Sequence, residues 1–188
     1  MIDVNPWDQM LCQYVDDQGR VDYQTWQRDA KDDLNDWLEA IAHTTIGDVQ
    51  DTNEQLAFWI NLYNALTIAQ VLSQYPIASI RPKILGLPNW IAFFRFFQRP
   101  IYQLSMDLSP QGGDRRYSLN DIEHGILRRH WHEPRIHFAL VCASVGCPLL
   151  RPEAYRGQTV QDQLEDDARR FINNPSKVRY DAQSNTLY

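Results

Sequence analysis

The chain has few cysteines, no basic cluster and no long uninterrupted apolar segment, and each absence argues against a class of protein. Three cysteines in 188 residues are too few, and odd in number, for a disulfide framework. The net charge is −6 and lysine and arginine are spread along the chain. We therefore expect no nucleic-acid partner, because phosphate contacts need clustered cations.

Two further absences concern membranes and secretion. The longest apolar candidate, residues 56–72, is interrupted by Asn61, Asn64 and Gln70, so it falls short of the ~18 apolar residues of a membrane span. The first ten residues, MIDVNPWDQM, contain no apolar run after a basic segment and do not form a signal peptide. These observations predict a reduced, cytoplasmic setting, unless a leader has been lost.

Several familiar catalytic signatures are also missing. The chain contains no phosphate-binding loop, no dinucleotide fingerprint, no G-x-S-x-G elbow and no H-E-x-x-H motif. We therefore expect no cofactor.

Aromatic and apolar residues are plentiful, and they predict a well-filled core. The sequence is 44% hydrophobic and has six tryptophans, nine tyrosines and seven phenylalanines. We expect one domain, residues 1–188, of the α+β class. It should be predominantly helical with a small, mostly antiparallel sheet. Apolar periodicity and capping residues predict helices at 6–15, 24–43, 54–74, 89–97, 118–129 and 152–173.

Three parts of the chain read as strands. Residues 101–106 and 116–118 are expected to pair across Gly112 and Gly113, and residues 178–188 to form a hairpin around Ser184 and Asn185. Residues 136–143 form a continuous apolar run of strand length, which predicts a buried strand.

The predicted helix 54–74 is apolar nearly all round, so we expect it to be central. Asn61 and Asn64 fall on its narrow, small-residue face, where their amides must be hydrogen-bonded. The plainer interpretation is that they hold a neighbouring loop in place. The alternative is that one of them orients a catalytic histidine or binds a ligand.

The predicted helix 118–129 carries a carboxylate beside its apolar side. Glu123 lies between Ile126 and Leu127 in projection, and a buried carboxylate is costly unless it is paired. We expect its partner to be Arg135 or a histidine, in a structural ion pair or as a tuned acid or base. His124 lies further round, on the surface or facing the same cleft.

The segment from Arg135 to Pro148 concentrates the reactive residue types. In a regular strand, His137 and Cys142 would point to opposite faces, so they could not pair directly. Cys147 follows a flexible loop that begins at Ser144, and it could return to either face. A cysteine at such an exit beside histidine is what a thiol nucleophile needs. Cys142 alone could equally be a small core residue.

Two further features suggest metal binding or partner binding. His124, His137, Cys142 and Cys147 could make a zinc set, but the two cysteines are separated by four residues and there is no second compact pair. The aromatic residues between Trp90 and Phe97, broken by Arg95 and followed by Arg99, could form an interaction patch or could belong to the core.

Three blocks together, and their order and spacing, resemble the domain of unknown function 547 family. They are AFWINLYNA at 57–65, SLNDIEHGILR at 118–128, and PRIHFAL at 134–140 with Cys142, Cys147 and Pro148. The resemblance spans about residues 7–188 and implies a fold and a set of motif positions without roles. Without a heptad segment, the chain resembles the free-standing bacterial form. Relatives continue past the last hairpin, so we expect a truncated or short version here.

These features lead to one main hypothesis and two alternatives. The main hypothesis is a thiol-dependent hydrolase or acyltransferase, possibly of a permuted papain-like kind, acting on a small-molecule or peptide substrate. Cys147 or Cys142 would be the nucleophile and His137 or His124 the base. Glu123 or Asn64 would orient the imidazole, and Arg135 would bind a substrate carboxylate. The alternatives are a non-catalytic interaction or ligand-binding module and a zinc-stabilised domain. The candidate site residues are Cys147, Cys142, His137, His124, Glu123, Arg135, Asn61, Asn64 and Ser144.

Overall fold

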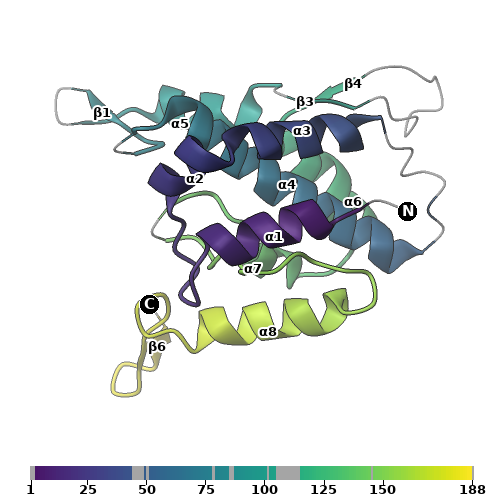
Figure 1. Ribbon diagram of the computed structural model, residues 1–188. Coiled ribbons are helices and arrows are strands. Elements are labelled where there is room, and N and C mark those ends of the chain that lie inside the picture. The colour runs from purple at the N-terminus through teal and green to yellow at the C-terminus, as the bar shows by residue number, and fades with distance from the viewer. Residues whose placement is uncertain are drawn as a thin grey trace.

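The computed structural model is mostly helical (Figure 1). The structure describes residues 3–43, 49, 51–77, 79–84, 87–100, 102–104, 115–144 and 146–187. The turn at Gly112 and Gly113 and the terminal Tyr188 lie outside these ranges.

Three N-terminal helices pack around a cluster of tryptophans. They are α1 (Asn5–Tyr14), α2 (Tyr23–Asp29) and α3 (Lys31–Ala42). The expected single helix 24–43 is wrong, because Ala30 leaves the helical region at φ −145°. In one straight helix, Trp26 and Trp37 would lie about 16 Å apart along the axis. The break brings the ring centroids of Trp26 and Trp37 to 5.9 and 5.7 Å from the ring centroid of Trp7.

The longest helix, α4 (Thr52–Gln74), runs through the centre of the molecule and was correctly expected. The Asp51 carboxylate caps it by accepting from the backbone N–H groups of Asn53 and Glu54. Among the described helices, only α4 is long and apolar enough to cross a membrane, yet 89% of its most apolar window is buried inside the protein. Figure 1 shows α4 passing behind α1 and α3, as a core helix does.

The strands form three separate antiparallel pairs, so within the described residues the expected small sheet is not one sheet. The pairs are β1 (Lys83–Ile84) with β2 (Leu87–Pro88), β3 (Tyr102–Leu104) with β4 (Arg115–Tyr117), and β5 (Tyr180–Asp181) with β6 (Thr186–Leu187). The last two pairs match the predicted strands. The nine-residue helix α5 (Trp90–Gln98) lies between the first two pairs, close to its predicted range.

The predicted buried strand at 136–143 is wrong. Its first half is a short helix, α7 (Ile136–Ala139), and its second half is irregular. Ile136 and Ala139 are both buried, at the i and i+3 spacing of a helix face. A short apolar run does not by itself distinguish a strand from a buried helical turn.

The predicted helix 118–129 contains an unusual stretch. It consists of η2 (Asp121–Leu127), a π-helix, followed by α6 (Arg128–His130). Ser118 and Asp121 bond reciprocally at its start: the Ser118 hydroxyl accepts from the Asp121 N–H at 3.1 Å, and the Asp121 carboxylate accepts from the Ser118 N–H at 2.9 Å.

The last long helix, α8 (Val160–Ile172), begins eight residues later than expected. The preceding backbone binds side chains of other elements. The Ala154 N–H donates to Asp8 at 2.7 Å, and the Tyr155 N–H donates to the Asn61 amide at 2.9 Å. The Asn61 amide in turn donates to the Tyr155 carbonyl at 2.8 Å. These bonds replace the ladder of a regular helix, so the segment packs against α1 and α4 as a loop.

Asn61 is 3% exposed, and its amide also accepts from the Trp7 indole N–H at 3.3 Å. Asn61→Ala should lower the free energy of unfolding by about 3 kcal/mol, because three buried polar groups would lose their partner. Urea denaturation measures this. As a control, the exposed Asn35 of α3 replaced by Ala should change stability by less than about 0.5 kcal/mol; equal losses would contradict the assignment.

Asp167 on α8 is 4% exposed, and its carboxylate accepts from the Tyr155 hydroxyl at 2.6 Å and from Arg151 at 2.9 Å. Burial raises its pKa, and this outweighs the two donors. The Asp167 carboxyl group therefore binds its proton more tightly in the folded state than in the unfolded state. Between the ordinary carboxyl pKa and the raised value, the stability contributed by Asp167 falls as pH rises. Asn does not titrate, so this decline should be absent in Asp167→Asn. The difference in free energy of unfolding between wild type and the variant, measured by urea denaturation, should therefore shrink as pH rises. A difference that stays constant or grows would contradict it.

Candidate functional site

The segment before the cysteine loop is fixed by one buried side chain. Asn64 of α4 is 1% exposed; its amide N–H donates to the Ala139 carbonyl at 3.0 Å and its oxygen accepts from the Val141 N–H at 3.1 Å. Together with the bonds from Asn61 to Tyr155, this confirms the plainer interpretation that the two amides hold neighbouring loops. The segment entering Cys142 is thereby given a fixed position on α4.

Cys142 and Cys147 are joined by a disulfide, with their Cα atoms 6.0 Å apart. Both residues are half-buried, and the exposed Ser144 lies between them with its Oγ 3.3 Å from Cys142 Sγ and 3.4 Å from Cys147 Sγ. Ala143 has a positive φ of 54°, a strained value for a residue with a Cβ. The loop therefore concentrates two sulfurs, a hydroxyl and a backbone outlier. The expectation of no disulfide framework did not anticipate this local pairing.

Glu123 is paired, but not with Arg135 or a histidine as expected. Arg128 donates to its Oε1 from Nη2 at 2.8 Å and from Nε at 3.1 Å, and the Tyr63 hydroxyl donates to its Oε2 at 3.3 Å. The π-helical turn aligns residues five apart, which places Arg128 over Glu123. Burial, followed by the charge of Glu123, raises the pKa of Tyr63, so its hydroxyl stays protonated.

The two candidate histidines lie on the surface, His124 on η2 and His137 on α7. His137 Nδ1 is 3.4 Å from Arg128 Nη2. A guanidinium only donates, so Nδ1 can only be the acceptor in this contact. The hydrogen bonds of the described residues include none from an imidazole to Cys142 or Cys147. The structure therefore brings together the cysteines and Ser144 in one group, and Glu123, Arg128 and His137 in another.

Arg135 belongs to a third group. Its guanidinium donates to Glu133 from Nε at 2.8 Å and Nη2 at 2.7 Å, to Gln161 at 2.8 Å and to Glu165 at 3.4 Å. These hydrogen bonds raise the pKa of Arg135, Glu133 first, and lower that of Glu133. The side chain anchors the start of α7 to α8 through Gln161 and Glu165.

The described residues contain no group of three or more histidine, cysteine or acidic side chains arranged to hold a metal ion. The four residues of the proposed zinc set are divided between a disulfide and two surface histidines. Nothing in their arrangement favours the zinc-stabilised alternative.

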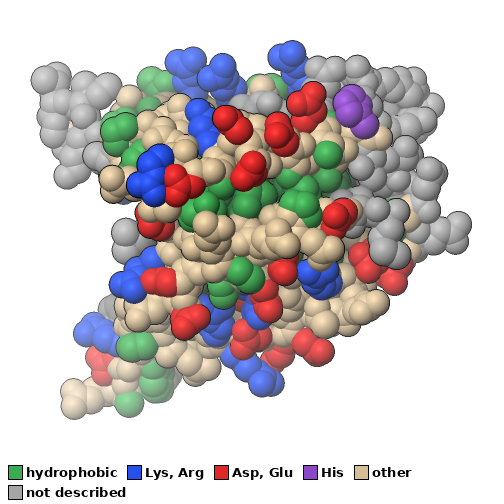
Figure 2. Space-filling view, in the orientation of Figure 1, with side chains coloured by type: hydrophobic (Ala, Val, Ile, Leu, Met, Phe, Trp, Pro, Cys, Tyr) green, Lys and Arg blue, Asp and Glu red, His purple; other side chains and the backbone are tan. Residues whose placement is uncertain are grey.

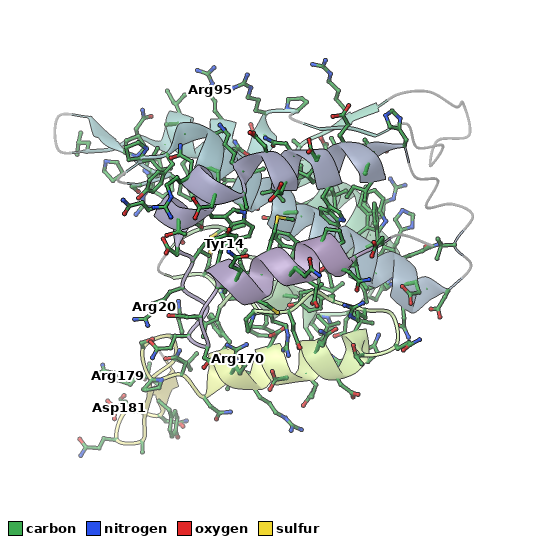
Figure 3. All side chains as sticks on the ribbon, viewed as in Figure 1. Tyr14, Arg20, Arg95, Arg170, Arg179 and Asp181 are labelled. Carbon is green, nitrogen blue, oxygen red and sulfur yellow. A yellow bond between two sulfur atoms is a disulfide. The ribbon has the colours of Figure 1, made fainter. Side chains whose placement is uncertain are left out.

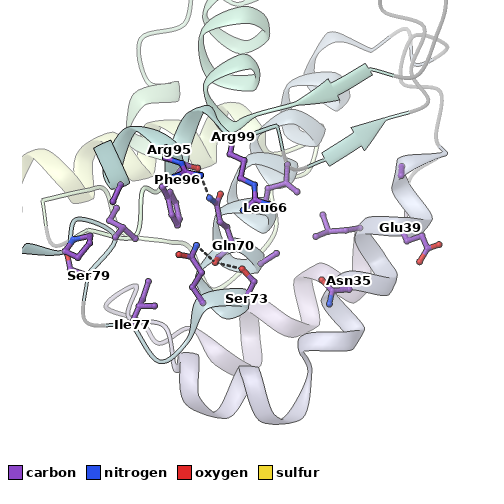
Figure 4. A pocket seen from close by; sticks show the side chains of 17 residues that line it. Asn35, Glu39, Leu66, Gln70, Ser73, Ile77, Ser79, Arg95, Phe96 and Arg99 are labelled. Atoms are coloured by element: carbon purple, nitrogen blue, oxygen red, sulfur yellow. Dashed lines mark hydrogen bonds between the residues drawn. The ribbon is translucent and has the colours of Figure 1, made fainter. Parts of the chain in front are cut away.

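A cavity of about 940 Å³ lies elsewhere, between α3, α4 and α5 (Figure 4). Its walls are apolar at Leu66, Ile77 and Phe96, with Arg95 and Arg99 at one side. The Gln70 amide donates to the Phe96 carbonyl at 2.8 Å, while its buried Oε1 has no hydrogen-bond partner among the described residues. None of the residues singled out from the sequence as site candidates lines this cavity.

Sequence reasoning missed several of these residues. Tyr63 and Arg128 lay inside recognised blocks but carried no signal of their own, because the spacing of five is hidden from a period of 3.6. The cavity residue Gln70 was noted only as an interruption of an apolar run. Lys177, which donates to the Cys147 carbonyl at 2.7 Å, follows the last predicted helix and had no distinguishing pattern.

Comparison with known proteins gives one match. No curated protein and no solved structure matches the chain. The family model described as "Protein of unknown function, DUF547" matches residues 48–172, which include α4, the π-helix, the cysteine loop and α8. The chain belongs to the DUF547 family.

Proposed function

We propose that the chain is a thiol-dependent hydrolase or acyltransferase whose nucleophile is Cys147 and whose resting form is the Cys142–Cys147 disulfide. The observation that supports it is the cysteine loop itself: two sulfurs and a hydroxyl, half-exposed, on a segment fixed by Asn64. Buried polar anchors under an accessible reactive loop are the support that a positioned nucleophile needs.

The two cysteines and Ser144 each have a part in this chemistry. A dithiol reductant first supplies two electrons and two protons, which converts the disulfide into two thiols. Ser144 Oγ, which contacts both sulfurs, then donates to the Cys147 thiolate and lowers its pKa. The thiolate attacks an acyl carbonyl, the leaving group departs with a proton, and water or an acceptor nucleophile releases the acyl group from the thioester.

The proposal requires a conformational change. Neither sulfur is hydrogen-bonded to an imidazole among the described residues, and His137 Nδ1 faces Arg128. For His137 to accept the thiol proton at Nε2, its proton must move to Nδ1 and the Arg128 contact must break. Opening the disulfide releases Cys147 from Cys142, which is the step that would bring Cys147 toward the imidazole. The papain-like arrangement considered from the sequence is not needed for this reaction.

Thiol labelling of the full chain tests the proposal. Without reductant, iodoacetamide should label only Cys12, which is exposed and free. After reduction, Cys147 should react faster than Cys12, and Ser144→Ala should slow Cys147 about tenfold by removing a hydrogen bond to the thiolate. Mass spectrometry of peptides measures each rate.

Activity completes this test. The reduced chain should hydrolyse members of an ester and thioester panel, Cys147→Ser should abolish turnover, and Cys12→Ser should leave it unchanged. Equal labelling of Cys147 and Cys12 after reduction, or no turnover of any panel member, would remove the thiol-dependent assignment.

A second candidate function is a non-catalytic ligand-binding module, and the cavity favours it. The lining combines an apolar wall with two arginines and the unpaired Gln70 oxygen. Such a set suits an amphipathic ligand with an anionic group, because pockets combine apolar walls with a few placed polar groups. In this version the asparagines and the Glu123 pair only hold the loops.

Filling the cavity distinguishes the two functions. The half-buried Ala69 lines it, and Ala69→Trp should weaken binding of a long-chain carboxylate probe at least tenfold by occupying the apolar volume. Isothermal titration calorimetry measures the affinity. Ala40→Trp, at an exposed position outside this cavity, is the control. No saturable binding, or equal binding by wild type and Ala69→Trp, would contradict the ligand-binding function.

A further inference from the structure

One face of α5 is apolar and exposed to solvent. Trp90 is 51% exposed, Ile91 74% and Phe94 51%, and Leu87 in β2 just before the helix is 72% exposed. At 100° per residue these helical positions fall on one arc, while Ala92, Phe93, Phe96 and Phe97 take the opposite, inward arc. A helix with bulky apolar side chains on both arcs buries only the inward arc against the protein, so the outward arc is left as an exposed apolar surface.

Two arginines border this apolar face. Arg95 follows Phe94 on the edge of the exposed arc and projects from the upper edge of the molecule in Figure 3. The Arg81 guanidinium lies over the Trp90 ring, 4.8 Å from its centroid. Exposed aromatic side chains bordered by arginine are typical of helices that lie in a membrane interface.

The charge distribution along the chain supports an anionic partner. Residues 55–106 contain four cations and no acidic residue, so the rest of a chain of net charge −6 carries a net −10. Figure 2 shows lysine and arginine side chains gathered along the upper edge of the molecule, with acidic side chains below them over α3. An anionic surface would repel the remainder of the chain and attract this edge, so electrostatics would orient α5 toward it.

We propose that this face, the α5 surface, attaches the protein to membranes that contain anionic lipid. Trp90, Ile91 and Phe94 enter the boundary between headgroups and acyl chains, and the arginines contact lipid phosphates. The proposal is independent of the thiol chemistry, and it shares one residue, Arg95, with the lining of the cavity. The α5 surface consists of Arg81, Leu87, Trp90, Ile91, Phe94 and Arg95.

Vesicle co-sedimentation of the full chain tests this attachment. The wild type should pellet with vesicles of phosphatidylcholine mixed with phosphatidylserine and stay in solution with phosphatidylcholine alone. Raising the salt concentration should release it, because exposed charges are screened. Arg95→Gln should lower the partition coefficient roughly fivefold, the effect of one basic residue near an anionic surface.

A pair of variants with uncharged replacements isolates the apolar part. Ile91→Asn combined with Phe94→Asn should abolish binding, while Ile172→Asn on α8, at a residue 54% exposed, should bind like wild type. Circular dichroism confirms that each variant is folded, which is expected because all three positions are exposed.

Two outcomes would overturn the proposal: wild type binds neither kind of vesicle, or it binds both equally and independently of salt. In the first case sedimentation velocity identifies the occupant. A wild-type dimer that becomes monomeric on the double substitution would show that a second copy of the chain covers the α5 surface.

Discussion

Two buried amides on one helix position the irregular parts of this molecule. α4 is buried on every side from Leu56 to Ile68, and an apolar helix offers a neighbouring loop no partner for its backbone N–H and C=O groups. Asn61 and Asn64 supply those partners, each donating to a carbonyl and accepting from an N–H. They thus do for the loops at Tyr155 and at 139–141 what a neighbouring strand would do. Buried backbone groups must be paired, so these loops pack on α4 at the positions where the Asn61 and Asn64 side chains supply hydrogen-bond partners.

This constraint explains which parts of the fold could be predicted. The helices at 5–14, 52–74 and 90–98 follow from caps and periodicity, which are local, and the expected ranges were close. The strand expected at 136–143 failed because the bonds of its backbone come from Asn64, more than seventy residues away. The alternation that separated His137 from Cys142 failed with it. The family resemblance is confirmed over residues 48–172, a span that contains the three quoted blocks, but it does not state which residues touch.

The candidate site shows the same limit at the level of single contacts. The pairing of Glu123 with Arg128 depends on a π-helical spacing of five, which no pattern based on 3.6 residues per turn reveals. The Cys142–Cys147 bond depends on a chain reversal through Ala143 at positive φ, a conformation that alanine seldom adopts. A loop this short gains only about 2 kcal/mol from cross-linking in the chain-entropy model. The disulfide therefore contributes little to stability. Its main effect is chemical, because it holds the two most reactive side chains of the segment in a half-exposed position.

The central helix also relates the cysteine loop to the far side of the molecule. Asn64 holds the segment before Cys142, and Gln70, six residues later on α4, holds α5 through the Phe96 carbonyl. The two side chains are about 9 Å apart along the helix axis. Substitutions at that separation that share no partner have nearly additive effects. A change at the cavity or at the α5 surface should therefore leave the reactivity of Cys147 as it was. If substitutions at the α5 side instead change the reactivity of Cys147 strongly, α4 must shift as a unit between two packed arrangements. A close-packed core does not transmit strain by gradual deformation.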